Sequence, residues 1–89
     1  MGNQEPVFKT SNIKISEIRY IGKEKKHVKV KFDVLDSSKK IDGIGFNMKD
    51  AFENIKSGDL IDLVFSIDKN IWNNIESLQL KIKDIKKIN

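Results

Sequence analysis

The feature that most constrains the fold is a strict alternation of apolar and polar side chains over residues 27–34. The apolar members are Val28, Val30, Phe32 and Val34, and the polar members are His27, Lys29, Lys31 and Asp33. Successive side chains of an extended chain point to opposite faces, so this segment has one apolar face and one polar face. The alternation predicts a strand that buries one face and exposes the other.

Four further segments are predicted as strands, at residues 13–21, 41–46, 60–68 and 77–84. In the first of them the alternation changes phase at Ser16-Glu17, which is typical of a β-bulge. In the second, Ile44 and Phe46 share a face that we expect to point into the core. Gly43 and Gly45 share the opposite face, which we expect to point outward.

The last two predicted strands each have one apolar face. We expect the inward side chains to be Ile61, Leu63, Phe65, Ile67, Leu78, Leu80 and Ile82. Residues 47–55 are predicted as a helix, with Asn47 as N-cap and with Met48, Ala51, Phe52 and Ile55 along one side. Gly58 is suited to ending that helix. Turns are predicted at 22–26 and 36–38, and a polar loop that contains Trp72 at 68–76.

The predicted order of elements is β-β-β-α-β-β, an all-β chain with one short helix. A bent first strand and a short helix between the third and fourth strands favour the five-stranded Greek-key OB-fold barrel. An SH3-like barrel is the alternative, although it usually lacks a helix at that point. We expect one OB-fold domain at residues 12–86, with an N-terminal lead-in at 1–11 and a frayed tail at 87–89.

The residue types present exclude several kinds of chemistry. Cysteine is absent and His27 is the sole histidine among 89 residues. A disulfide scaffold, a thiolate zinc site, a cysteine nucleophile and a two-histidine metal site are therefore excluded within this chain. No apolar run approaches the roughly 20 residues that span a bilayer, and the N-terminus lacks the apolar stretch of a signal peptide. We expect a cytoplasmic protein that binds no cofactor through this chain and does not contact a membrane.

The net charge of +4 is unevenly distributed. It is +5 over residues 1–40, −4 over residues 41–76 and +3 over residues 77–89. In an OB barrel the third strand lies between the second and the fifth, so the two basic ends of the chain should share one face. Such a face is the electrostatic footprint of a nucleic-acid-binding protein.

A set of short motifs gives a more specific indication than the charge. They are Gly22-Lys23, Lys26-His27, Ile44-Gly45-Phe46, Ser57-Gly58-Asp59, Asp62-Leu63-Val64-Phe65, Trp72-Asn73, Leu78-Gln79-Leu80 and Asp84-Ile85. By their order and spacing the chain resembles the OB domain of RecJ-type single-strand-specific DNA exonucleases, from Pro6 to about Lys86. It departs from that family in having Asn74 where glycine is frequent, and lysine at positions where arginine is frequent. Asn tolerates a positive φ, and lysine keeps the charge without the bidentate geometry of arginine.

The resemblance implies a parent enzyme of DNA repair and recombination that hydrolyses single-stranded DNA from the 5′ end with a metal-bound Asp-His-His core. That motif does not occur in these 89 residues. We therefore expect this chain to have no hydrolytic activity of its own. A divalent metal is expected only in the catalytic core of the parent nuclease, and the expected partners are single-stranded DNA and that core.

OB barrels usually bind ligands across the second and third strands, between the loops that join strands 1 and 2 and strands 4 and 5. The predicted nucleic-acid-binding residues are Lys23, Lys25, Lys26, His27, Lys29, Lys31, Lys81, Lys83 and Trp72. The lysines could instead serve solubility, and Trp72 could stack on a base, cap the core or contact another domain, the last two being favoured. Phe32, Phe46, Phe52 and Phe65 are expected in the core, so binding is predicted to follow the DNA backbone rather than the bases.

These features predict a single-stranded-DNA-binding accessory domain of a RecJ-like 5′–3′ exonuclease. The alternative is an OB module that packs on its own enzyme core or on another protein, without intrinsic DNA affinity. It would carry an apolar surface patch around Ile71, Trp72 and Ile75. An RNA-binding OB domain is a third interpretation, which no particular residue supports.

Overall fold

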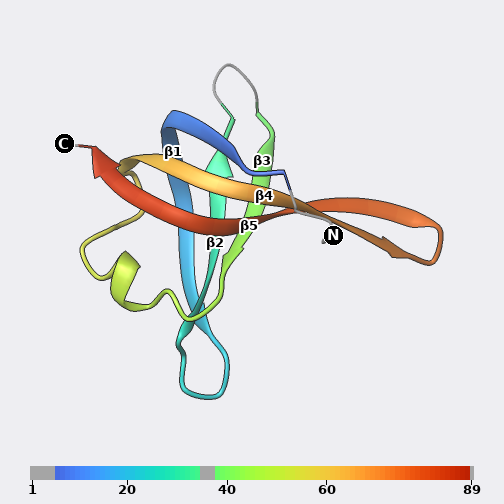
Figure 1. Cartoon of the computed structure of the whole chain (residues 1–89), viewed down its shortest axis with the longest axis horizontal. Helices are drawn as coiled ribbons and strands as arrows, with labels where there is room; N and C mark the ends of the chain where they lie inside the picture. Colours follow the sequence, from blue (N-terminus) through green and yellow to red (C-terminus); the bar gives the residue numbers. More distant parts are fainter. Residues whose placement is uncertain (1–5, 35–37, 89) are drawn as a thin grey trace.

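The computed structural model describes residues 6–34 and 38–88, and the predicted turn at 36–38 therefore lies partly outside the described residues. Its strands are β1 (Phe8–Ile21), β2 (His27–Asp33), β3 (Lys40–Gly45), β4 (Leu60–Trp72) and β5 (Ile75–Ile88). They close into a barrel in the order β1-β2-β3-β5-β4, shown in Figure 1. The β3–β5 pair is parallel and the other pairs are antiparallel. This is the predicted OB-fold barrel. Among the described residues, no helix is long and apolar enough to span a membrane.

Strand β1 closes the barrel because it pairs with two strands, β4 and β2. Its first half pairs with β4 and its second half pairs with β2. The β1–β2 register shifts between Ile15 and Glu17, which confirms the predicted bulge. A bulge adds a residue to one strand and bends it, so β1 can leave one partner and join the other.

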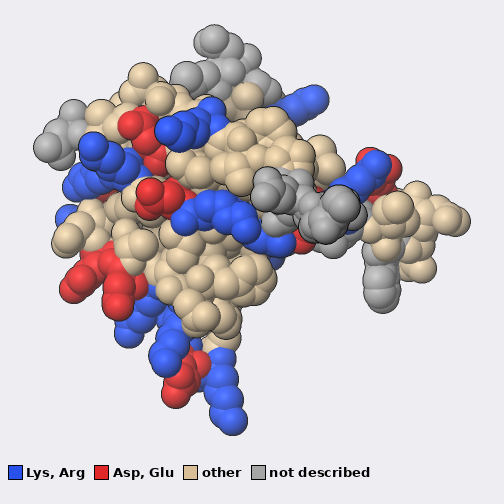
Figure 2. Space-filling model, viewed as in Figure 1, with Lys and Arg blue, Asp and Glu red and all other residues tan. Residues whose placement is uncertain are grey.

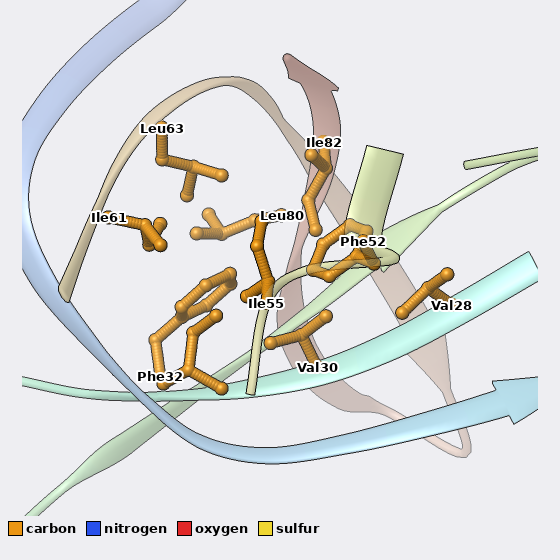
Figure 3. Packing of buried hydrophobic residues seen from close by; sticks show 10 residues of the cluster. Val28, Val30, Phe32, Phe52, Ile55, Ile61, Leu63, Leu80 and Ile82 are labelled. Carbon is orange, nitrogen blue, oxygen red and sulfur yellow. The ribbon is translucent and has the colours of Figure 1, made fainter. Parts of the chain in front are cut away.

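The core lies inside the barrel and is built from β1, β2, β4, β5 and the segment between β3 and β4 (Figure 3), with Ile41 of β3 packed against it. Its buried members are Ile15, Val28, Val30, Phe32, Phe52, Ile55, Ile61, Leu63, Leu80 and Ile82. The inward face predicted for residues 27–34 is confirmed by Val28, Val30 and Phe32. Two side chains predicted to be inward, Ile67 and Leu78, are instead 46% and 58% exposed.

The predicted helix at 47–55 is reduced to one 3-10 turn, η1 (Asp50–Phe52). Asn47 is not its N-cap: it has a φ of 54° and precedes a cap residue, Lys49, that makes no side-chain capping hydrogen bond. The turn still supplies Phe52, which is fully buried at one end of the barrel. The Tyr20 hydroxyl donates a hydrogen bond to the Phe52 carbonyl at 3.4 Å, which ties β1 to η1.

The prediction for β3 was wrong about which face points inward. Gly43 and Gly45 are buried, because they stand opposite Val30 and Val28 and share the inward face of those residues. A Cβ at Gly43 would lie 2.8 Å from Cε2 of Phe32. Glycine here makes room for the large Phe32 ring, and neither Gly43 nor Gly45 lies on the outer face.

The predicted polar loop at 68–76 is an extended hairpin arm instead. Strands β4 and β5 pair in one register from Phe65 and Ile82 to Trp72 and Ile75, and the arm projects beyond the barrel in Figure 1. Asn73 and Asn74 form the two-residue turn with φ of 50° and 63°. Positive φ at both central positions is the hairpin geometry that asparagine tolerates, so Asn74 adopts the turn conformation as expected.

Pairing also reaches into both segments predicted to flank the domain. Phe8 pairs with Phe65, and the centroids of their rings are 5.8 Å apart. At the other end of the chain Ile88 pairs with Leu60, so β5 continues to Ile88 rather than ending near Asp84.

Candidate nucleic-acid interface

The outer face of the barrel carries one row of side chains that crosses four strands. Lys29 on β2 stands opposite Arg19 on β1 and Ile44 on β3, and Ile44 stands opposite Lys81 on β5. Residues directly opposite one another point to the same face of a sheet. We call Arg19, Lys29, Ile44 and Lys81 the central row, which has three cationic members and one apolar member.

The neighbouring row on the outer face, formed by Glu17, Lys31 and Asp42, contains two acidic residues and one basic residue. Lys31 stands opposite Glu17 on β1 and Asp42 on β3. Two carboxylates therefore flank its ammonium group, whereas Lys29 has a second cation and an isoleucine beside it. Within the described residues neither Arg19 nor Lys29 forms an ion pair. Arg19 and Lys29 thus differ from Lys31 in having no carboxylate opposite them, and we call the row of Glu17, Lys31 and Asp42 the acidic border.

The β1–β2 turn extends the positive charge beyond the strands. It contains Lys23, Lys25 and Lys26, and Figure 2 shows basic side chains gathered on this lower projection, with acidic atoms among them. Lys26 pairs with Glu24 at 2.9 Å, but both side chains are more than half exposed, so the pair contributes little. The turn is anchored because the Lys26 carbonyl accepts a hydrogen bond from the Lys49 N–H at 3.2 Å.

His27 joins this turn to the end of β3. Its Nδ1 accepts a hydrogen bond from the Asn47 backbone N–H at 3.0 Å. Its ring lies edge-on to Phe46, with 5.4 Å between centroids and 72° between planes. On its other side, a Cβ at Gly22 would lie 2.8 Å from the His27 Cδ2. His27 is therefore packed between the two segments.

Phe46 overturns the prediction that it belongs to the core. It is 54% exposed and follows directly on β3, two residues beyond Ile44 of the central row. The reason is the face reversal of β3: when Gly43 and Gly45 point inward, Ile44 and Phe46 point outward. The outer face thus carries an aromatic ring beside its cations.

The structure brings together most of the residues predicted to bind nucleic acid. Lys29 and Lys31 are on the outer face of β2, and Lys81 and Lys83 on β5 also make contacts within the protein. Trp72 lies at the end of β4, far along the arm from the central row, and the prediction for its side chain lies outside the described residues.

Three residues of this face were missed by sequence reasoning: Arg19, Ile44 and Phe46. The signal for Arg19 was present, because a β1–β2 hairpin centred on the turn at 22–26 pairs residue 19 with residue 29. The signal for the face of β3 was weak, because apolar side chains stand on both faces: Ile41 shares a face with Gly43 and Gly45, whereas Ile44 and Phe46 share a face with Asp42.

The chemistry of this surface suits binding. Among residues 6–34 and 38–88, no three His, Asp or Glu side chains gather as they would around a metal ion. The cations of the central row instead carry the charge that attracts a polyanion such as a phosphate backbone.

The order of the strands in the closed barrel defines an OB-fold protein. The family model described as the RecJ OB domain matches residues 1–84, so the chain belongs to the RecJ OB-domain family. A curated relative, the single-stranded-DNA-specific exonuclease RecJ of Bacillus subtilis (strain 168), is 36% identical over 84 residues. The match covers 94% of this chain and 10% of that relative, so the chain spans about a tenth of its length.

Solved structures with the same fold include mitochondrial single-stranded DNA binding proteins from S. cerevisiae, Rim1. One form has a TM-score of 0.73 at 15% identity, with 96% of this chain and 95% of that chain covered. A second form has a TM-score of 0.69 at 15% identity and covers 96% and 97%. At this level of identity the likeness concerns the fold, which it confirms as an OB-fold.

Proposed function

We propose that this domain binds single-stranded DNA along the central row and thereby guides substrate for a RecJ-like 5′–3′ exonuclease. The observation that carries the proposal is the alignment of Arg19, Lys29 and Lys81 across three different strands on one outer face. The names of the RecJ relative and of the Rim1 structures agree with this ligand. Because the cations would contact phosphates, affinity should depend on salt and little on base sequence.

In this proposal the domain has no hydrolytic role. Hydrolysis would take place in a metal-dependent catalytic core elsewhere in the RecJ polypeptide, and that core is the proposed protein partner. Binding by the present chain should therefore need no divalent ion. A titration with and without EDTA should give the same affinity.

The proposal is tested by titrating fluorescein-labelled oligo-dT with the wild-type chain, with an Arg19→Glu/Lys29→Glu variant and with a Lys9→Glu variant. Lys9 is a matched control, because it is an exposed lysine in the part of β1 that pairs with β4. We expect the double variant to bind at least tenfold more weakly at about 50 mM salt, and Lys9→Glu to bind nearly as the wild type does. Equal binding by all three chains would overturn the central row as the site, and absence of wild-type binding would overturn the function.

A second candidate function is favoured by the apolar surface of the arm. Ile71, Ile75 and Leu78 are 70%, 68% and 58% exposed. A groove of about 1070 Å³ opens beside the arm, and its apolar lining is formed by Ile13, Ile41, Phe65, Ile67, Leu78 and Leu80. Ile71 and Leu78 lie on the same face of the arm as Ile67 and Leu80, and exposed apolar surface of this kind is typical of a protein contact. Here the contact would be with the catalytic part of the RecJ polypeptide.

The two candidate functions differ in which substitutions should abolish them. An Ile71→Ser/Leu78→Ser variant should weaken docking to the catalytic part of RecJ in a pull-down with purified components, and should leave oligo-dT affinity unchanged. Arg19→Glu/Lys29→Glu should do the reverse. A domain that docks and never binds DNA would support the second candidate alone.

A further inference from the structure

The exposed ring of Phe46 is not explained by binding to phosphates. It is 54% exposed beside the central row, where a lysine or a small polar residue would serve a backbone-binding surface better. A large apolar side chain left in water forgoes the free energy of burial. The outer face therefore has a group suited to a flat, apolar ligand next to groups suited to phosphate.

The ring is also held in place. His27 packs edge-on against it at 5.4 Å, and the His27 Nδ1 is fixed by the Asn47 N–H at 3.0 Å. Because Nδ1 accepts that hydrogen bond, the proton of a neutral His27 ring lies on Nε2. Behind His27, Gly22 leaves no free space, since even a Cβ there would be 2.8 Å from the ring. Phe46 thus stands on a packed support.

We propose that Phe46 forms a stacking site for one unpaired nucleobase, while Arg19 and Lys29 hold the adjacent phosphates. The proposal rests on the proposed function and adds base contact to it, in contrast to the backbone-only binding that the sequence predicts. Aromatic rings of proteins stack on any base, because every base has a π-face. Duplex DNA would be excluded at this site, because its bases are already stacked and paired.

The direct test compares oligo-dT with an abasic oligonucleotide of equal length, which has the phosphates and no bases. We expect the wild-type chain to bind oligo-dT about tenfold more tightly, which lies within the usual range for one stacked base. Phe46→Leu should lose that preference and still bind the abasic strand as the wild type does. Phe46→Trp should keep the preference. Phe8→Leu is a matched control, because Phe8 is 44% exposed on the β4-facing part of β1.

The outcomes distinguish failure of the stacking site from failure of the proposed DNA-binding function. If the wild-type chain binds both oligonucleotides equally, or if Phe46→Leu keeps the full preference, base stacking at Phe46 is overturned and salt-dependent backbone binding stands. If neither oligonucleotide binds at low salt, the proposed function fails together with the stacking site. Circular dichroism of each variant checks that the barrel is folded.

His27 is a positioning residue in this proposal, since it supports Phe46 through ring contact and through Asn47. His27→Ala should reduce the preference for oligo-dT over the abasic strand several-fold, with little change in abasic binding. His27→Asn should restore part of it, because the Asn side-chain oxygen can accept the Asn47 N–H. A folded His27→Ala chain with the wild-type preference would contradict the positioning role.

Discussion

At the scale of single residues, Gly43 decides which side chains of β3 lie on the outer face of the barrel. Its missing side chain admits the Phe32 ring to the core, and this sets the inward face of β3. Ile44 consequently points outward between Lys29 and Lys81, and Phe46 follows on the same face. A residue with no side chain thus determines the composition of the binding surface.

A Gly43→Ala substitution should destabilise the barrel. The new Cβ would lie 2.8 Å from Cε2 of Phe32 and 3.4 Å from Cδ1 of Ile82. Overpacking of a core costs about 1–3 kcal/mol, which exceeds the smaller gain from replacing a strand glycine. Urea unfolding followed by circular dichroism measures the loss.

Gly58→Ala is the control for that experiment. Gly58 has a φ of 96° and no atom within 4 Å of an added Cβ, so its loss should be about 1 kcal/mol and should come from the backbone alone. A Gly43→Ala chain as stable as the wild type would show that Gly43 does not face the core.

At the scale of elements, the outer face is a product of register. The pairing of β2 with β1 and β3 puts Lys29 beside a cation and an apolar residue, and puts Lys31 between Glu17 and Asp42. Two lysines two residues apart on one strand therefore have different surroundings. The acidic border should confine a bound strand to the central row and the β1–β2 turn.

Removing the acidic border should strengthen binding. A Glu17→Gln/Asp42→Asn variant keeps the shape of both side chains and removes two negative charges. We expect oligo-dT affinity to rise a few-fold at low salt, and the gain to shrink at about 150 mM salt, where the Debye length is about 8 Å. Unchanged affinity at low salt would show that bound DNA does not pass near this border.

The turn η1 closes one end of the barrel, because its Phe52 side chain is fully buried in the core there. Phe52→Ala should cost about 3–5 kcal/mol, a large part of the stability of a domain of this size. Thermal unfolding should show a large fall in Tm, whereas Ala51→Ser, at an exposed neighbour in the same turn, should have little effect. A small fall for Phe52→Ala would show that this closure is dispensable.

At the scale of the whole molecule, the barrel converts a charge pattern along the chain into a surface. The basic first part of the chain supplies Arg19 and Lys29, the basic last part supplies Lys81, and β3 lies between them. The acidic middle is not wholly elsewhere, because Asp42 stands on the same outer face beside Lys31. The net +4 of the whole chain thus hides surfaces of different charge, among them a cationic row and an acidic border.

The strands, their order and the bulge in β1 could be predicted because alternation and phase are local properties. The face of β3 could not, since apolar side chains stand on both of its faces, with Ile41 on one and Ile44 on the other, and the choice depends on the size of Phe32 on another strand. The arm was mistaken for a loop because its polar residues, including Asn70, Asn73 and Asn74, are typical of loops. Its pairing is set by a two-asparagine turn that brings β4 and β5 together. The outward direction of Lys29 and Lys31 could be predicted because it follows from the alternation within β2. The exposure of Phe46 could not, because it depends on the face of β3.

The central claim is that single-stranded DNA binds through phosphate contacts on the central row. It is tested most directly by the slope of log K against log salt concentration for oligo-dT. We predict a slope of about −2 for the wild-type chain, from about three phosphate contacts at about −0.7 each, and a slope of about −0.7 for Arg19→Gln/Lys29→Gln. A wild-type slope near zero, or the same slope in both chains, would contradict the claim.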